Sequence, residues 1–209
     1  MTPPRRLIVG ISGASGAVYG LRLLELLRGT GIETHLVVTR AADVTRGHEL
    51  ELSAGELRAL ATVHHPVTDI GAAIASGSFR TMGMIVAPCS VRTLSEIATG
   101  ATGNLLTRAA DVVLKERRRL VLLFRETPLH LGHIRNMLAA TEAGAIVMPP
   151  VPAFYTRPET VEDIVDHTIG RVLDLFGIES DLVRRWGEPP PDGEQPIRRF
   201  PGRAAGAKP

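Results

Sequence analysis

The fold is decided by the stretch Leu7-Ile8-Val9-Gly10-Ile11-Ser12-Gly13-Ala14-Ser15-Gly16. A continuous apolar run, β-branched in part, stops at a short loop of glycine and serine. A leucine-rich helical pattern follows this loop and ends at Gly29. The pattern predicts a buried strand, a glycine turn and a helix.

The same alternation of apolar runs and amphipathic segments continues along the chain. We expect further strands at 34–38, 84–87, 120–124 and 145–148, and helices at about 91–98, 104–117, 130–142 and 159–176, with two or three short helices within 40–80. Strands that alternate with helices indicate a parallel sheet covered on both faces. The sequence therefore predicts an α/β fold, a single domain with a parallel sheet over 1–186, followed by a flexible Pro/Gly-rich tail over 187–209.

Composition excludes several classes of protein. The 209 residues are 44% hydrophobic and 22% charged, and their apolar runs are far shorter than the ~20 residues that cross a bilayer. Basic and acidic side chains number 24 and 22, and aromatic residues make up only 4%, so we expect no nucleic-acid partner. The single cysteine, Cys89, permits no intrachain disulfide and fits a cytoplasmic protein.

Ligands of open parallel sheets bind beyond the carboxyl ends of the strands. The first such end carries Gly13-Ala14-Ser15, where glycines allow a close backbone approach and the helix start presents free N–H groups. This loop is neither a P-loop nor a GxGxxG motif. It indicates phosphate or cofactor binding, and the alternative is an ordinary turn in which Ser15 caps the helix.

Two later strand ends are also polar. Ser90 and Thr93 stand three residues apart at a helix start, a spacing that suits helix capping and also contact with an anion. Arg125 suits a phosphate or an electron-rich ring and Glu126 suits proton transfer, and the alternative is a structural salt bridge with a neighbour. Cys89 lacks the setting of a nucleophile and is expected to be a packed small residue.

The histidines show no zinc-binding spacing and no cysteine pair accompanies them, so we expect no metal site. Arg108 and Lys115 lie seven residues apart on one helical face and could add positive charge to a site, although each alone is more often a solvated surface residue.

Five blocks of the sequence, in order, resemble the flavin prenyltransferase (UbiX) family. They are GASGAVYGLRLLELL, APCSVRTLSEIATG, NLLTRAADVVLKERRRLVLLFRETPL, NML and AFYTRPETVEDIVDHTIGRVLDLFGI, and they extend from about Arg6 to Trp186. The resemblance implies a Rossmann-like flavoprotein that transfers a dimethylallyl group from dimethylallyl monophosphate to reduced FMN. It also implies that the prenylated FMN serves a UbiD-type decarboxylase, and that the chain forms a homo-oligomer, typically a dodecamer.

The resemblance implies roles for individual residues. The cofactor-binding positions would be Gly13, Ala14, Ser15, Thr39, Ser90, Val91, Arg92, Thr93 and Arg125. The catalytic positions would be Glu126, which is assigned to proton transfer, together with Ser15, Glu49 and Lys115. The alignment with the family around Glu49 also permits Glu51 at this catalytic position. The donor phosphate would be held by Arg108, Lys115, Tyr155 and Arg171.

The sequence is also compatible with two other functions. One is an FMN-dependent cysteine decarboxylase, although its Asn-rich substrate motif has no counterpart around Asn136-Met137. The other is an FMN carrier or decarboxylase subunit without prenyl transfer. A pure flavin carrier has no need for the cationic set that would stabilise a departing phosphate.

Overall fold

The computed structural model describes residues 4–183 and 185. Its core is a six-stranded sheet in the order β3-β2-β1-β4-β5-β6, in which every pair of neighbouring strands is parallel. The strands are β1 (Arg6–Ile11), β2 (Glu33–Val38), β3 (Val63–His65), β4 (Gly83–Cys89), β5 (Arg119–Phe124) and β6 (Ile146–Val147). The predicted α/β fold with a parallel sheet is therefore confirmed.

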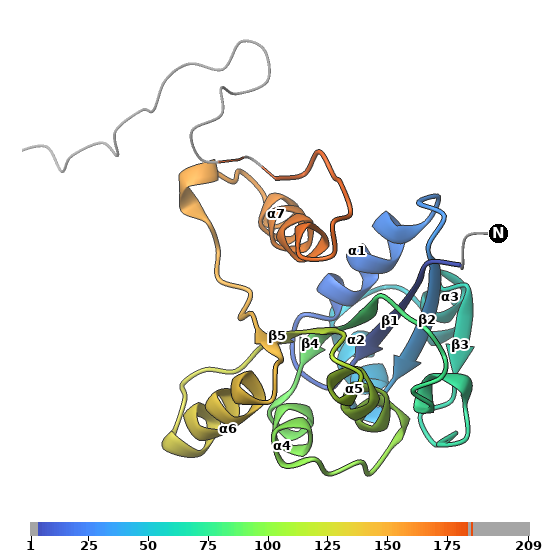
Figure 1. Cartoon of the computed structure of the whole chain (residues 1–209). Coiled ribbons are helices and arrows are strands. Elements are labelled where there is room, and N and C mark those ends of the chain that lie inside the picture. The colour runs from blue at the N-terminus through green and yellow to red at the C-terminus, as the bar shows by residue number, and fades with distance from the viewer. Residues whose placement is uncertain (1–3, 184, 186–209) are drawn as a thin grey trace, which may run out of the picture.

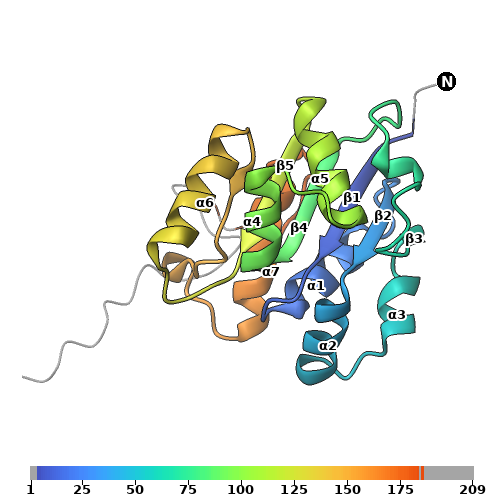
Figure 2. The same cartoon turned by 90° about the horizontal axis from the view of Figure 1, so that it is seen from below.

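Helices cover both faces of this sheet (Figures 1 and 2). They are α1 (Ala17–Leu27), α2 (Arg40–Glu49), α3 (Ala54–Ala59), α4 (Val91–Thr99), α5 (Leu105–Lys115), α6 (Leu131–Glu142) and α7 (Val161–Asp174), with two 3-10 turns, η1 (Ala73–Ala75) and η2 (Phe154–Thr156). Alternate residues of each strand face opposite sides, so the central strands need an apolar residue at every position.

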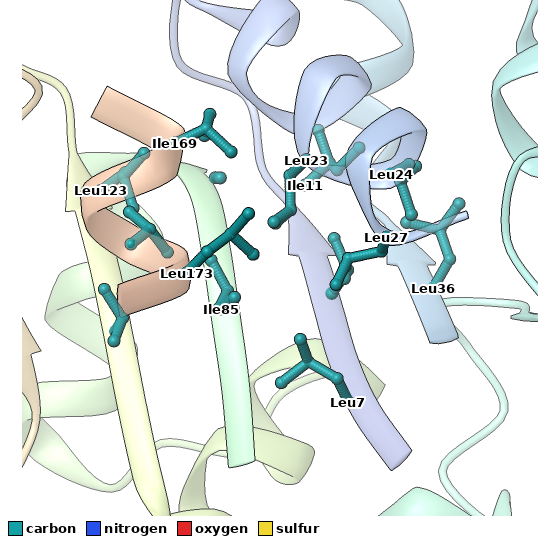
Figure 3. Packing of buried hydrophobic residues seen from close by; sticks show 14 of the residues in the cluster. Leu7, Ile11, Leu23, Leu24, Leu27, Leu36, Ile85, Leu123, Ile169 and Leu173 are labelled. Atoms are coloured by element: carbon teal, nitrogen blue, oxygen red, sulfur yellow. The ribbon is translucent and has the colours of Figure 1, made fainter. Parts of the chain in front are cut away.

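Two separate apolar clusters hold the layers together. On one face, leucines of α1 pack on the odd-numbered residues of β1, and the buried side of α7 packs beside them over β4 and β5, as Figure 3 shows for Leu23 with Ile11 and for Ile169 with Leu123. On the other face, α4 and α5 pack on the even-numbered residues of β1, such as Ile8. This arrangement leaves the carboxyl ends of the strands free to carry polar loops.

The strands expected at 34–38, 84–87 and 120–124 are present within one or two residues. The strand expected at 145–148 is reduced to the pair Ile146–Val147, and the edge strand Val63–His65 was not predicted. The tail expected over 187–209 lies outside the described residues. No helix in the described part of the chain has the length and apolar character that crossing a bilayer requires.

Candidate functional site: a pocket at the carboxyl edge of the sheet

A cavity of about 600 Å³ opens at the carboxyl ends of β1, β2, β4 and β5. It brings together ten of the residues predicted from sequence, which lie far apart along the chain. They are Gly13, Ala14, Ser15, Thr39, Ser90, Val91, Arg92, Thr93, Arg125 and Glu126. The convergence follows from topology, because parallel strands present all their carboxyl ends at one edge.

The loop after β1 lies close against α2 and requires glycine. A Cβ atom on Gly13 would come within 2.3 Å of the Ala41 Cβ, so a larger residue would push the loop away. Gly16 then caps α1 with a φ of 106°, a backbone conformation that residues other than glycine rarely adopt. Close packing therefore fixes the path of this loop at the pocket.

Glu49, at the end of α2, binds the start of α1. Its Oε2 accepts hydrogen bonds from the N–H groups of Gly16 (2.9 Å) and Ala17 (2.8 Å), and Ser15 adds a side-chain hydrogen bond. Burial alone would raise the pKa of Glu49, but these hydrogen bonds outweigh it and hold the pKa below its ordinary value. Glu49 thus occupies the α1 N-terminus as an anion and contacts the pocket through Ser15 rather than lining it. The structure records no such contact for Glu51.

The loop after β2 supplies a hydroxyl and a cation. Thr39 caps α2 by accepting a hydrogen bond from the Ala42 N–H at 3.1 Å. Arg40, the first residue of that helix, also lines the cavity, although sequence reasoning did not select it. A basic residue directly after a polar strand end was the signal that could have found it.

The loop after β4 places a helix N-terminus at the cavity. Ser90 caps α4, and its hydroxyl bonds both the N–H of Thr93 (3.3 Å) and the Thr93 hydroxyl (3.1 Å). The positive end of the α4 dipole and these hydroxyls favour an anion or a carbonyl oxygen. Cys89 is fully buried and its burial raises the pKa of the thiol, which agrees with the expected packing role.

One wall of the cavity is a charged network on α4. Glu96 accepts hydrogen bonds from Arg92 (2.7 Å) and from the Asn104 side chain (3.3 Å). Glu96, Asn104 and Val67 line the cavity and were not predicted. Asn104 caps α5, so its polar side chain at a helix start was a usable signal. Glu96 and Val67 reach the cavity through tertiary packing alone, which no local sequence pattern predicts.

The end of β5 contributes Arg125 and Glu126. The backbone of Arg125 is anchored by a 3.0 Å hydrogen bond from its N–H to the Cys89 carbonyl. The positive charge of Arg125 helps to lower the pKa of Glu49, and it opposes the effect of burial, which raises the pKa of Tyr19. Glu126 accepts a 2.9 Å bond from the N–H of Thr127. Both charged side chains line the pocket, and neither forms a salt bridge with a neighbour among the described residues.

The four residues predicted to grip a donor phosphate do not line this cavity. Arg108 pairs with Asp111 at 2.7 Å, Lys115 with Glu116 at 2.5 Å and Arg171 with Asp174 at 2.9 Å. Tyr155 lies in η2, with its hydroxyl 3.4 Å from Nε2 of His167. Within one chain these four residues do not line the pocket, so their role in holding the donor phosphate stays a prediction. Within 4–183 and 185, no group of three or more His, Cys, Asp or Glu side chains could hold a metal ion.

Comparison with known proteins agrees with the geometry. A family model described as Flavoprotein matches residues 1–173. A flavin prenyltransferase UbiX of Escherichia coli (strain K12) is 60% identical over 185 residues, which cover 87% of this chain and 98% of that protein.

Two solved structures share both sequence and fold with the chain. AnUbiX (PadA1) in complex with FMN and dimethylallyl pyrophosphate is 48% identical with a TM-score of 0.86, over 88% of this chain and 98% of that one. A dodecameric FMN-dependent UbiX-like decarboxylase from Escherichia coli O157:H7 is 52% identical with a TM-score of 0.85, over 88% of this chain and 100% of that one.

Proposed function

The chain belongs to the UbiX flavin prenyltransferase family of flavoproteins, and from that premise we propose that it joins a dimethylallyl group to reduced FMN in the cavity at the carboxyl edge of its sheet. The observation that carries the proposal is the convergence of ten separately predicted residues on one cavity of about 600 Å³. Neither an FMN carrier nor a cysteine decarboxylase accounts for the relatives at more than half identity that are named flavin prenyltransferases.

The side chains of the cavity fit FMN. The N-terminus of α4 and the hydroxyls of Thr39 and Thr93 offer hydrogen-bond donors to a phosphate or to flavin carbonyls. Arg125, directly after β5, adds a cation to the lining of the cavity. When bound, reduced FMN supplies the electron-rich ring that accepts the allylic carbon.

The residues of this chain would then bind and orient the two substrates and move protons. Glu126 is placed to carry a proton on its carboxylate oxygens, since it lines the cavity and is not paired with Arg125. Ser15 and Glu49 form a hydrogen-bonded pair at the adjacent loop and would orient the prenyl donor. Breaking the allylic C–O bond leaves negative charge on the phosphate, which Lys115 and its predicted partners would stabilise.

We propose that this donor set reaches the cavity from a neighbouring chain. A solved relative of the same fold is described as dodecameric. The chain also exposes apolar side chains beyond what a monomer needs, on α6 at Leu131 (58%) and Leu138 (59%) and in η2 at Phe154 (69%). These surfaces suit contacts between copies of the chain in a homo-oligomer, with a dodecamer as the expected form.

The monophosphate form of the donor, the delivery of product to a UbiD-type decarboxylase and the cytoplasmic location rest on the resemblance in sequence. The experiment that tests the function incubates the protein with reduced FMN without oxygen, in parallel with dimethylallyl monophosphate and with the diphosphate. We expect mass spectrometry to find a flavin heavier by one isoprene unit. Unmodified FMN with both donors would overturn the assignment and favour a carrier.

A further inference from the structure

A buried hydroxyl, that of Ser12, connects two of the loops that line the cavity. Ser12 follows β1 and is 1% exposed. Its Oγ donates a 3.0 Å hydrogen bond to the carbonyl of Pro88 and accepts a 2.8 Å bond from the N–H of Ser90, both of which follow β1 by more than seventy positions. No role in the proposed chemistry uses this side chain, which does not line the cavity.

The direction of these bonds is fixed. The single hydroxyl hydrogen of Ser12 points to the Pro88 carbonyl, which also receives the Ser12 backbone N–H at 3.2 Å. The remaining lone pairs of Oγ therefore face the Ser90 N–H. Ser12 Oγ is the only partner found for the Ser90 N–H among the described residues, whereas the Pro88 carbonyl also has the Ser12 N–H.

The Ser90 hydroxyl in turn forms two hydrogen bonds with Thr93. The Ser90 hydroxyl accepts a bond from the Thr93 N–H and donates its own hydrogen to Thr93 Oγ1 at 3.1 Å. The Thr93 oxygen is thus an acceptor in that bond, and no acceptor for its own hydrogen is found among the described residues. Thr93 lines the cavity, so this hydrogen is available to a ligand there.

We propose that Ser12 is a positioning residue that fixes the Ser12–Ser90–Thr93 chain, so that Thr93 presents a hydrogen-bond donor to the cofactor. The inference rests on the proposed binding of FMN in this cavity. It assigns to Ser12 no contact with the ligand. Without the Ser12 hydroxyl the Ser90 N–H loses its acceptor, and the free protein can relax into arrangements that FMN must reverse on binding.

The test measures the dissociation constant of FMN by quenching of its fluorescence, together with the melting temperature of each variant. For Ser12→Ala we expect the dissociation constant to rise about tenfold or more. The matched control is Thr168→Val, which removes a buried hydroxyl (5% exposed) bonded to the Ile164 carbonyl at 2.7 Å on α7, away from the cavity. This control should leave FMN affinity within about twofold of the parent.

A double-mutant cycle tests the route through Thr93. Thr93→Val removes the end of the chain, so adding Ser12→Ala to it should weaken FMN binding little further. Full additivity of the two effects would overturn the inference, as would parent-like FMN affinity in Ser12→Ala with a lowered melting temperature. If Ser12→Ala does not fold, Ser12→Cys, whose thiol is a weaker partner, should raise the dissociation constant, and an unchanged value would overturn the proposal. Failure of the parent protein to bind FMN would instead contradict the proposed function.

Discussion

Lys115 and Glu126 lie at opposite ends of strand β5. Lys115 is the last residue of α5, just before β5 begins, and Glu126 lines the cavity beyond its end. The strand between them has six residues, which span about 20 Å at ~3.3 Å per residue. A lysine and a carboxylate that are predicted to serve one reaction are therefore separated within the chain, and we propose that a second chain brings them together.

Glu126→Gln should separate binding from chemistry. The amide keeps the shape of the side chain and its acceptor oxygen for the Thr127 N–H, so FMN affinity should stay within about threefold of the parent. The amide cannot carry a proton in the required way, and product formation should fall by about 10²- to 10⁴-fold. Fluorescence titration and anaerobic product analysis give the two quantities. Loss of FMN together with activity would mean that Glu126 is structural.

Thr39→Ala should weaken both α2 and the cofactor site. Loss of the cap costs about 1 kcal/mol of stability, and loss of the hydroxyl removes a donor from the cavity. The matched control is Ser53→Ala, because Ser53 caps α3 in the same way and lies outside the cavity. Thermal melts should show similar losses for the two variants. FMN affinity should fall only for Thr39→Ala, and an equal effect of both variants would contradict the placement of Thr39 in the site.

Two glycines should respond in opposite directions to alanine. At Gly13 a Cβ would meet Ala41 at 2.3 Å, so Gly13→Ala should lower the melting temperature and weaken FMN binding. At Gly47, inside α2, a Cβ would meet nothing within 4 Å, and Gly47→Ala should stabilise the protein by about 0.5–1 kcal/mol. Denaturant unfolding measures the stability of both variants. A stable, FMN-binding Gly13→Ala protein would contradict the close approach of the loop to α2.

The contribution of Glu49 to stability should depend on pH. Its folded pKa lies below the ordinary 4.5, so its ionised form stabilises the folded protein at higher pH, and this stability is lost as the pH falls through the folded pKa. The parent should therefore melt above Glu49→Gln near neutral pH, and the difference should shrink below pH 4.5. Melting temperatures of the two proteins across pH give the comparison. A difference that grows toward low pH would contradict the contacts of Glu49 with α1.

The sequence was sufficient for the elements with strong local signals. Continuous apolar runs located β1, β4 and β5, and polar residues directly after them located Ser15, Ser90 and Arg125 in the cavity. Strand β3 was missed because its three residues include two histidines and lie at the sheet edge, where burial does not impose an apolar pattern.

Other features depend on contacts that no local pattern encodes. Glu96 reaches the cavity from the second turn of α4 because Arg92 and Asn104 hold its carboxylate there. The hydrogen bond between Ser12 and Ser90 joins residues that follow different strands, so it becomes visible only once β1 and β4 are known to be neighbours. The separation of Lys115 from the cavity likewise follows from helix α5 running to the far edge of the sheet.

We propose that prenyl transfer occurs in the cavity of one chain completed by cations of another. The decisive experiment mixes two impaired variants, Glu126→Gln and Lys115→Ala, in the same oligomer by coexpression. Some sites in such an oligomer combine an intact cavity with an intact Lys115, so formation of prenylated FMN should rise well above that of either variant alone. Mixed oligomers no more active than the separate variants would contradict a site shared between chains.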